Sequence, residues 1–290
     1  MSFATGLKTI VVATDLHGQS EAALEYARKL ATHYGARIVL AHGTDPLEYA
    51  AVNTVPEQVL DGLPEPARTE LDKLAGELLR QGIPSHSEIR QGAVAQMLVD
   101  VARQYAADLI VMGTKGCEGA GPIVVGAIAE QLVRLAPCGV MAVAADWNAG
   151  PFRPTPGGPV MLAMEHNDAT AEAVTAAQSL ARTFNRPLIL VHAGGQGANP
   201  CATTAQDYGI EPNGDITVHC VAKQGSPADA IAEAIAQYRP CILVAGVKRT
   251  SETPGPHGTA FALLASSRVP VLCVPPEIAA SRPEPEAQVS

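Results

Sequence analysis

The segment with the clearest chemical potential is a glycine-rich stretch over residues 113–127, GTKGCEGAGPIVVGA. Glycine lets a backbone approach a ligand closely, and successive N–H groups in such a loop can point at phosphate oxygens. A helix predicted over residues 128–135 would add the favourable partial charge of its N-terminus. The stretch contains no Gly-Lys-Ser/Thr ending, and no Gly-x-Gly-x-x-Gly follows the first strand, which excludes a Walker loop and a Rossmann dinucleotide site. The residues alone leave a phosphate cradle and a flexible turn equally open.

Other polar residues stand where predicted strands end. Thr14-Asp15 follows the first strand and His42-Gly43 follows the second. Ligands of open parallel sheets bind beyond the carboxyl ends of the strands, so these are informative positions. His42 and His192 occupy one repeat position at equivalent strand ends. A metal ion or a general base would need a second ligand that the sequence does not show, so a structural role is favoured for both histidines.

An internal repeat supplies the elements that position these residues. Residues 10–15 (IVVATD) are echoed by 160–165 (VMLAME), and each run precedes an Ala-rich helical pattern. Short runs of branched residues at 38–42 and 188–192 then predict buried parallel strands. The remaining pairs are the glycines Gly92 and Gly225 with the helices after them, the strands 109–113 and 242–246, and the strands 140–144 and 271–274.

This alternation of strand and helix predicts two tandem doubly wound α/β domains, each with a five-stranded parallel sheet. The predicted division is an N-terminal domain over 1–146, a linker over 147–159, a C-terminal domain over 160–275 and a disordered tail over 276–290. The stretch 44–62 is long for a connection in such a fold, and we leave open whether it is a lid or a mobile insertion.

Composition excludes several classes of function. Of the 290 residues, 47% are hydrophobic and 17% are charged, which is suited to packed helices on sheets. The net charge of -9 and the lack of a dense basic cluster argue against nucleic acid as a partner. No export signal or long apolar run is evident, so we expect a cytoplasmic protein without membrane contact. The six scattered cysteines, with no Cys-x-x-Cys pair, fit a reducing compartment, and Cys117 in the glycine-rich stretch is expected to be incidental.

One pattern in the chain resembles a known family. The spacing Gly113-x2-Gly116-x9-Gly126 at the end of the fourth strand precedes Ala-Glu-x-Leu and the run 136–138 (APC). It is similar to the ATP-binding signature of the universal stress protein family. The resemblance extends to residues 12–15, His42 and Gly92, and it covers nearly all of residues 5–146. It implies a Rossmann-like fold of the adenine-nucleotide α hydrolase type.

The resemblance also implies a site for ATP, or for ADP or AMP, with Mg²⁺ or Mn²⁺ bound to the nucleotide. Asp15 would accept hydrogen bonds from the ribose or help to hold the metal ion, although it also suits a capped turn. The backbone at Thr14 and Gly43 would face the adenine, the glycines would surround the phosphates, and Lys115 would neutralise phosphate charge or simply be solvated. The predicted cofactor-binding set is Ala13, Thr14, Asp15, Gly43, Met112, Gly113, Thr114, Lys115, Gly116, Gly126, Ala127 and Ile128. We assign no catalytic residue.

One position departs from the family pattern. Nucleotide-binding members usually have Ser or Thr after the last glycine of the motif, and this chain has Ala127. The loss of one hydroxyl donor typically costs about 0.5 to 1.5 kcal/mol, or up to about tenfold in affinity. We therefore expect a weakened site rather than an abolished one.

The second copy of the loop, over residues 246–259, departs further. Arg249 replaces its second glycine, eleven residues rather than twelve separate its outer glycines, and Glu165 follows its first strand. We expect no comparable ATP site there. Lys248, Arg249 and His257 leave open some other anion, although a basic surface loop is favoured.

These observations predict a stress-response regulator with one nucleotide site in its first half. The alternatives are slow ATP hydrolysis in the same pocket, with Asp15 and a metal ion positioning water, and a structural module without nucleotide. The resemblance implies that the tandem halves mimic the dimer that single-domain members make between chains. We also expect whole chains to pair as a homodimer and to meet a protein partner of unknown identity.

Overall fold

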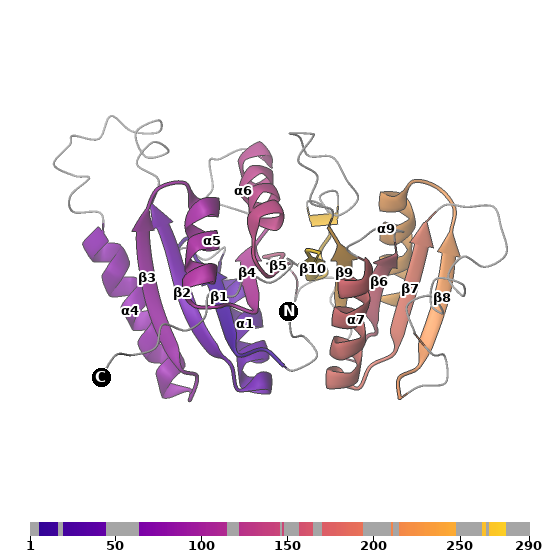
Figure 1. Ribbon diagram of the computed structural model, residues 1–290, viewed down its shortest axis with the longest axis horizontal. Helices are drawn as coiled ribbons and strands as arrows, with labels where there is room; N and C mark the ends of the chain where they lie inside the picture. Colours follow the sequence, from indigo (N-terminus) through magenta and orange to yellow (C-terminus); the bar gives the residue numbers. More distant parts are fainter. Residues whose placement is uncertain are drawn as a thin grey trace, which may run out of the picture.

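The computed structural model describes residues 6–16, 20–44, 64–114, 122–145, 147, 157–164, 170–193, 210, 215–247, 263–264 and 267–276. Strands and helices alternate along the first half, as the branched apolar runs and the Ala-rich patterns predicted (Figure 1). Its elements are β1 (Thr9–Ala13), α1 (Glu21–Tyr34), β2 (Arg37–Thr44), α4 (Pro64–Arg80), β3 (Ser85–Gln91), α5 (Val94–Gln104), β4 (Leu109–Gly113), α6 (Pro122–Leu135) and β5 (Gly139–Val143).

The second half repeats this order with fewer described elements. They are β6 (Val160–Met164), α7 (Thr170–Phe184), β7 (Leu188–Ala193), β8 (Val218–Lys223), α9 (Pro227–Tyr238), β9 (Ile242–Gly246) and β10 (Val271–Val274). The doubly wound α/β fold is therefore confirmed. The domain boundaries at 146, 160 and 275 stay a prediction, and the predicted tail lies outside the described residues from residue 277 onward.

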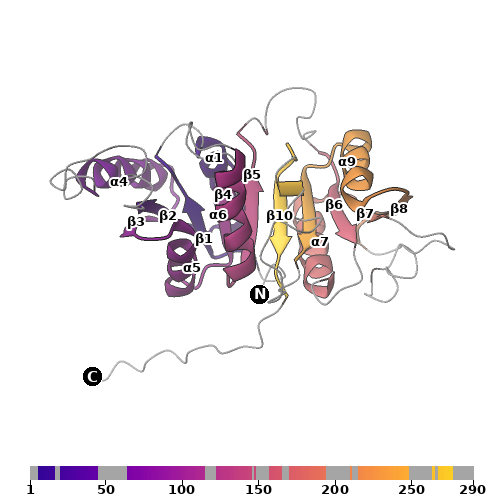
Figure 2. The same cartoon turned by 90° about the horizontal axis from the view of Figure 1, so that it is seen from above.

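Both halves contribute to one ten-stranded sheet, in the order β3-β2-β1-β4-β5-β10-β9-β6-β7-β8. Within each half the strand pairs are parallel. The two inner edge strands, β5 and β10, pair antiparallel, with Leu272 opposite Met141 and Cys273 opposite Val140. We call this pair the seam. Figure 2 shows β5 and β10 side by side between the two halves.

Helices cover both faces of this sheet because successive strand residues point to opposite sides. One apolar layer joins strand residues such as Ile10 and Leu162 to helices α1, α4 and α7. The other layer joins residues such as Val11 and Met161 to α5, α6 and α9. All four of these strand side chains are fully buried. The halves also meet at helix ends, where the His33 ring lies 5.4 Å from the ring of Phe184.

Helix α1 has a clear stop signal. It ends at Tyr34, before Gly35, whose φ of 66° is left-handed and whose N–H donates to the Ala31 carbonyl. Trp147, which follows β5, packs against this helix. Its ring meets Tyr26 edge-on at 5.3 Å, and Lys29 Nζ lies 4.7 Å from the ring centre. Trp147, which lies just after the last strand of the first half, is thereby held against α1.

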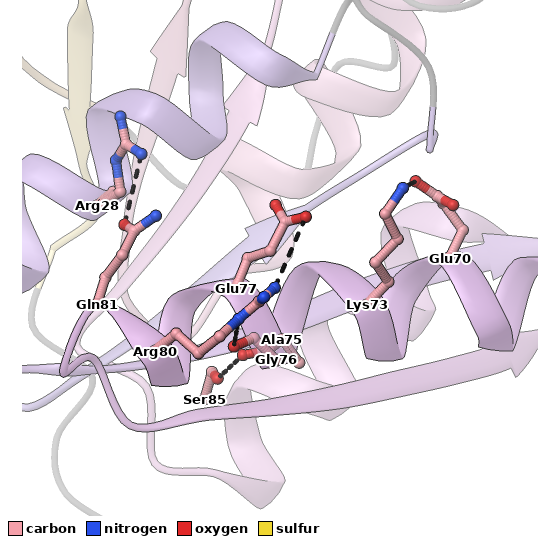
Figure 3. A network of polar contacts seen from close by, with 9 residues as sticks. All are labelled: Arg28, Glu70, Lys73, Ala75, Gly76, Glu77, Arg80, Gln81 and Ser85. Carbon is pink, nitrogen blue, oxygen red and sulfur yellow. Dashed lines mark hydrogen bonds and ion pairs between the residues drawn. The ribbon is translucent and has the colours of Figure 1, made fainter.

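Helix α4 covers the outer strand β3. The Ser85 hydroxyl donates to the Ala75 carbonyl at 2.7 Å, which joins strand to helix, and Arg28 of α1 reaches Gln81 at 3.4 Å (Figure 3). Exposed pairs along α4, such as Lys73 with Glu70, add little because water screens them. Our sequence reading did not identify α4.

Helix α6 differs from the prediction. We expected it over 128–135, and it begins at Pro122. Proline suits the first turn of a helix because its φ is already helical and the missing N–H needs no partner there. Gly126 and Ala127 consequently lie within the helix rather than in a loop before it. The stretch 45–63, which contains most of the segment with an open role, lies outside the described residues.

Candidate functional site

The turn after β1 presents Asp15 beyond the end of the strand. Leu16 has a φ of 60°, a left-handed backbone that branched side chains rarely adopt. Its N–H donates to the Thr14 hydroxyl at 3.0 Å, and that hydroxyl also lies 2.9 Å from the Ser20 hydroxyl at the start of α1. Thr14 and Ser20 are both buried. Two hydroxyl groups therefore tie the turn to the first helix.

The end of β2 fixes the same turn from the other side. The Thr14 N–H donates to the Ala41 carbonyl at 3.0 Å, and His42 Nδ1 lies 2.8 Å from the Thr14 carbonyl oxygen. A carbonyl only accepts, so the histidine must carry a proton on Nδ1. The expected structural role of His42 agrees with this bond. We expected the Thr14 backbone to face the adenine; its N–H pairs within the sheet, while its carbonyl keeps a second lone pair.

Gly43 offers only backbone at the end of β2. A Cβ at this position would lie 2.7 Å from Met97 Cε and 3.3 Å from Val94 Cγ2. Helix α5 therefore packs close to the strand end, and a side chain on residue 43 would displace the Met97 methyl group. The absence of a Cβ leaves the N–H and carbonyl as the groups that a ligand can reach here.

The end of β4 completes the edge. Met112 is buried, and the Thr114 N–H donates to the Val143 carbonyl at 3.1 Å, which extends the pairing of β4 with β5 by one residue. Strand β1 pairs with β2 on one side and with β4 on the other. The ends of these three strands carry the predicted residues Ala13, Thr14, Asp15, Gly43, Met112, Gly113 and Thr114 to one edge of the sheet. Ile128, half-buried on α6, packs against the apolar layer that includes Met112.

The remaining predicted positions are only partly described. Lys115 and Gly116 lie outside the described residues, as does Cys117, and for Gly126 and Ala127 the structure describes the helical backbone alone. The phosphate loop thus stays a prediction. Its start, at the end of β4, and the helix after it are in place.

The donor set at this edge suits a metal ion brought by a nucleotide. Among the described residues, no three His, Cys, Asp or Glu side chains gather to hold a metal ion. Mg²⁺ is usually bound by one or two carboxylates together with substrate phosphates. Asp15 is such a carboxylate, so it fits a nucleotide-borne ion better than a resident one.

The second half keeps the same strand pairing with different side chains. Met164 occupies the place of Thr14 and lies opposite His192 on β7. Glu165, the loop 248–262 and most of the connection before β8 lie outside the described residues. Met164 lacks a hydroxyl like that of Thr14, which ties the first turn to its helix.

Sequence reasoning placed Asp15, Gly43 and Gly113 together but missed their supports. Ser20, Leu16 and Met97 were not assigned to the site. A serine just before a helix is a familiar start signal and would have marked Ser20. The left-handed turn at Leu16 and the approach of Met97 leave no signal in residue type.

Comparison with known proteins agrees with this architecture. The sequence model of the universal stress protein family matches residues 6–144. Universal stress protein MJ0531 of Methanocaldococcus jannaschii is 30% identical over 138 residues, which span 47% of this chain and 81% of the relative. A universal stress protein of Thermus aquaticus, encoded in the QAH/OAS sulfhydrylase 3′ region, is also 30% identical over 138 residues, spanning 47% of this chain and 98% of the relative.

A solved structure extends the likeness in fold to both halves. The crystal structure of a universal stress protein from Archaeoglobus fulgidus superposes with a TM-score of 0.74 at 16% identity, and the match covers 92% of this chain and 98% of that one. The relatives in sequence each match about half of the chain, whereas this structure matches nearly all of it. The chain belongs to the universal stress protein family.

Proposed function

We propose that this chain binds an adenine nucleotide, ATP in the first place, at the carboxyl edge of β1, β2 and β4, and that the bound nucleotide regulates its conformation or partners. The observation that carries the proposal is the position of this edge. The strand order changes direction between β1 and β4, and ligands of doubly wound sheets bind at such a switch point. Asp15 lies beyond the end of β1, and the first motif glycine, Gly113, is the last residue of β4.

Different residues contact the ribose, the base and the phosphates of the nucleotide. Asp15 accepts hydrogen bonds from the ribose hydroxyls or holds Mg²⁺ or Mn²⁺ on the phosphates. The backbone of Gly43 and the Thr14 carbonyl face the base, with Ala13, Met112 and Ile128 as apolar neighbours. Gly113, Thr114 and Gly116 lie along the phosphates, Gly126 and Ala127 lie beside them within α6, and Lys115 supplies charge. The output is binding, and no residue is assigned to hydrolysis.

The second half serves as a packing partner. Its β10 occupies the edge of β5, so the strand that a single unit would leave exposed is paired within the chain. A regulator of this kind acts by presenting a different surface when nucleotide is bound. We propose that it does so in the cytoplasm, as a homodimer or with a protein partner.

Calorimetric titration of the purified chain with ATP, ADP and AMP, with and without Mg²⁺, tests the proposal. We expect one ATP per chain, and we expect the double variant Gly113→Val/Gly116→Val to lose it. Gly246→Val at the end of β9 is the matched control and should keep the stoichiometry. Thermal unfolding of both variants checks that they are folded.

Each outcome separates the candidates. Two nucleotides per chain would show that the second loop also binds, and no binding would favour a structural module. Release of inorganic phosphate that is lost in the Gly113→Val/Gly116→Val variant would establish an ATP hydrolase at the proposed site. Phosphate release that persists in this variant would point to a contaminating enzyme.

A further inference from the structure

We infer that His42 is a positioning residue of the nucleotide site, which acts by holding the Thr14 carbonyl so that the turn presents Asp15 in one fixed place. This inference rests on the proposed function for its effect on affinity. Its structural basis is the set of contacts that converge on Thr14 from β2 and α1.

The turn would not keep this shape by itself. Leu16 has a φ of 60°, where the branched side chain is crowded by its own backbone. Such a residue persists only when neighbouring groups over-determine its conformation, and such residues cluster at ligand sites. Asp15 is its immediate neighbour, so the direction of the Asp15 carboxylate depends on what holds Thr14 and Leu16.

Three side chains supply that hold. The Thr14 hydroxyl accepts from the Leu16 N–H at 3.0 Å and pairs with the Ser20 hydroxyl at 2.9 Å. The His42 ring donates from Nδ1 to the Thr14 carbonyl at 2.8 Å. Both hydroxyl groups are shielded from water, since Thr14 is 8% and Ser20 is 9% exposed. Water is therefore a poor substitute for any partner that is removed.

His42 is the contact that joins the turn to a second strand. The peptide between Thr14 and Asp15 is planar, so fixing the Thr14 carbonyl also fixes the direction of the Asp15 N–H. The hydroxyl pair acts only through the side chain of Thr14, whereas the histidine acts on this peptide directly. Loss of the ring removes this hydrogen bond from the carbonyl and frees the peptide to rotate.

Two substitutions of His42 distinguish the loss of its hydrogen bond from the loss of its side-chain volume. In His42→Asn the amide nitrogen stands in the place of Nδ1 and can donate to the Thr14 carbonyl, whereas His42→Leu fills the space without a donor. His192→Leu is the matched control, because it removes a histidine from the same repeat position in the second half. Thermal unfolding reports the cost of each change to the fold.

The first measurement needs no nucleotide. Amide hydrogen exchange at Thr14 and Leu16, followed by NMR in the nucleotide-free chain, should speed up by about tenfold or more in His42→Leu and stay near wild type in His42→Asn. Unchanged exchange in His42→Leu would overturn the inference, even if the variant were less stable overall.

The second measurement is titration with ATP and Mg²⁺. We expect His42→Leu to lose about tenfold or more in affinity, and His42→Asn and His192→Leu to stay within about twofold of wild type. If His42 acts through Asp15, the double variant His42→Leu/Asp15→Ala should bind no more weakly than Asp15→Ala alone. Additive losses would show that the histidine contacts the ligand directly and would overturn a positioning role.

The two claims fail in different ways. If the wild-type chain binds no adenine nucleotide while exchange responds as expected, the proposed function is wrong and the hold on the turn stands. If the wild-type chain binds ATP and His42→Leu binds it equally well, the proposed function stands and the positioning role is wrong.

Discussion

The two halves of the chain repeat one order of strands but differ at the turn after the first strand of each. In the first half, the Thr14 hydroxyl holds Leu16 and Ser20, whereas Met164 stands at the matching place in the second. Both strands nevertheless pair with their neighbours in the same register. Pairing needs backbone groups and branched apolar side chains, while holding a carboxylate beyond the sheet needs particular polar side chains. The strand pairing therefore does not depend on the polar contacts that Thr14 makes in the first half.

The outer strands show a second difference. On β3, Glu88 accepts from the Tyr105 hydroxyl at 2.5 Å, and helix α4 covers the other face. On β8, Val221 takes the place of Glu88, and the described residues between β7 and β8, which are 210 and 215–217, are not helical. The buried Ile210 and Ile216 lie in the same apolar layer as α4. In the first half a whole helix thus covers the outer strand. In the second half the buried residues described in the corresponding connection are these two isoleucines.

The largest expected effect tests the covering helix. Leu71 of α4 is fully buried, so Leu71→Ala should lower the free energy of unfolding by about 2 to 5 kcal/mol. Chemical denaturation followed by circular dichroism and by the fluorescence of Trp147 would measure it. Exposed Leu79→Ala on the same helix is the control and should cost far less. Coincident transitions are expected if the seam makes the halves unfold together, and separate transitions would contradict that.

The next effect tests the two turns directly. Asp15→Ala should weaken ATP binding by about 10- to 100-fold, because a hydrogen bond to a charged group contributes about 1.5 to 3 kcal/mol. Calorimetry would measure it, with Glu165→Ala as the counterpart in the second half. The comparison breaks down if Glu165→Ala weakens binding as much as Asp15→Ala does.

The next smaller effect is a gain in ATP affinity rather than a loss. Ala127→Ser restores a hydroxyl after the last motif glycine, and it should raise ATP affinity by up to about tenfold. Ala127→Val, which adds bulk without a donor, is the control. An unchanged dissociation constant in the serine variant would mean that no phosphate of the bound nucleotide reaches residue 127 of α6.

The smallest effect concerns pH at the outer strand of the first half. Burial, followed by the hydrogen bond to Glu88, raises the pKa of Tyr105 from 10.0 to about 12. Because the folded chain holds this proton more tightly than the unfolded chain, its stabilisation is complete below about pH 10 and is lost as the pH rises through about 12. In Tyr105→Phe, the fall of the thermal midpoint over this range should be shallower.

A substitution of Glu88 provides the control for the pH experiment on Tyr105→Phe. Glu88→Gln keeps the shape of the acceptor and removes its charge, so it should flatten the same pH dependence in part, because burial remains. A profile in Tyr105→Phe that follows the wild type throughout would show that other groups account for the fall.

Much of the fold was predictable because buried parallel strands carry their signal locally. The strand over 109–113 was predicted with the bounds that β4 has, and the family resemblance implied that the two halves pack together. Helix α4 was missed although Leu71, Leu74, Ala75 and Leu78 recur at helical spacing, because the second copy is shorter in this part of the chain and the repeat supplies no counterpart. The seam is a contact between distant segments, and neither period nor composition encodes which edges meet.

The candidate site, like the fold, was only partly predictable from the sequence. Asp15 and Gly113 were placed at one edge because strand ends of a parallel sheet lie together. The donation from His42 to the Thr14 carbonyl was not foreseeable, since any residue supplies a carbonyl and the partner leaves no trace in the sequence. Contacts of the predicted residues with a nucleotide stay a prediction.

The antiparallel join of β5 to β10 has a consequence for how the protein can vary. In a sheet assembled from two identical chains, every substitution appears twice, so a change that spoils one binding edge spoils both. Here each position occurs once in the assembled sheet, and Met164 in place of Thr14 alters one edge alone. Each half can therefore vary at its own edge of the sheet, while the shared strand pairing still requires both halves to fold.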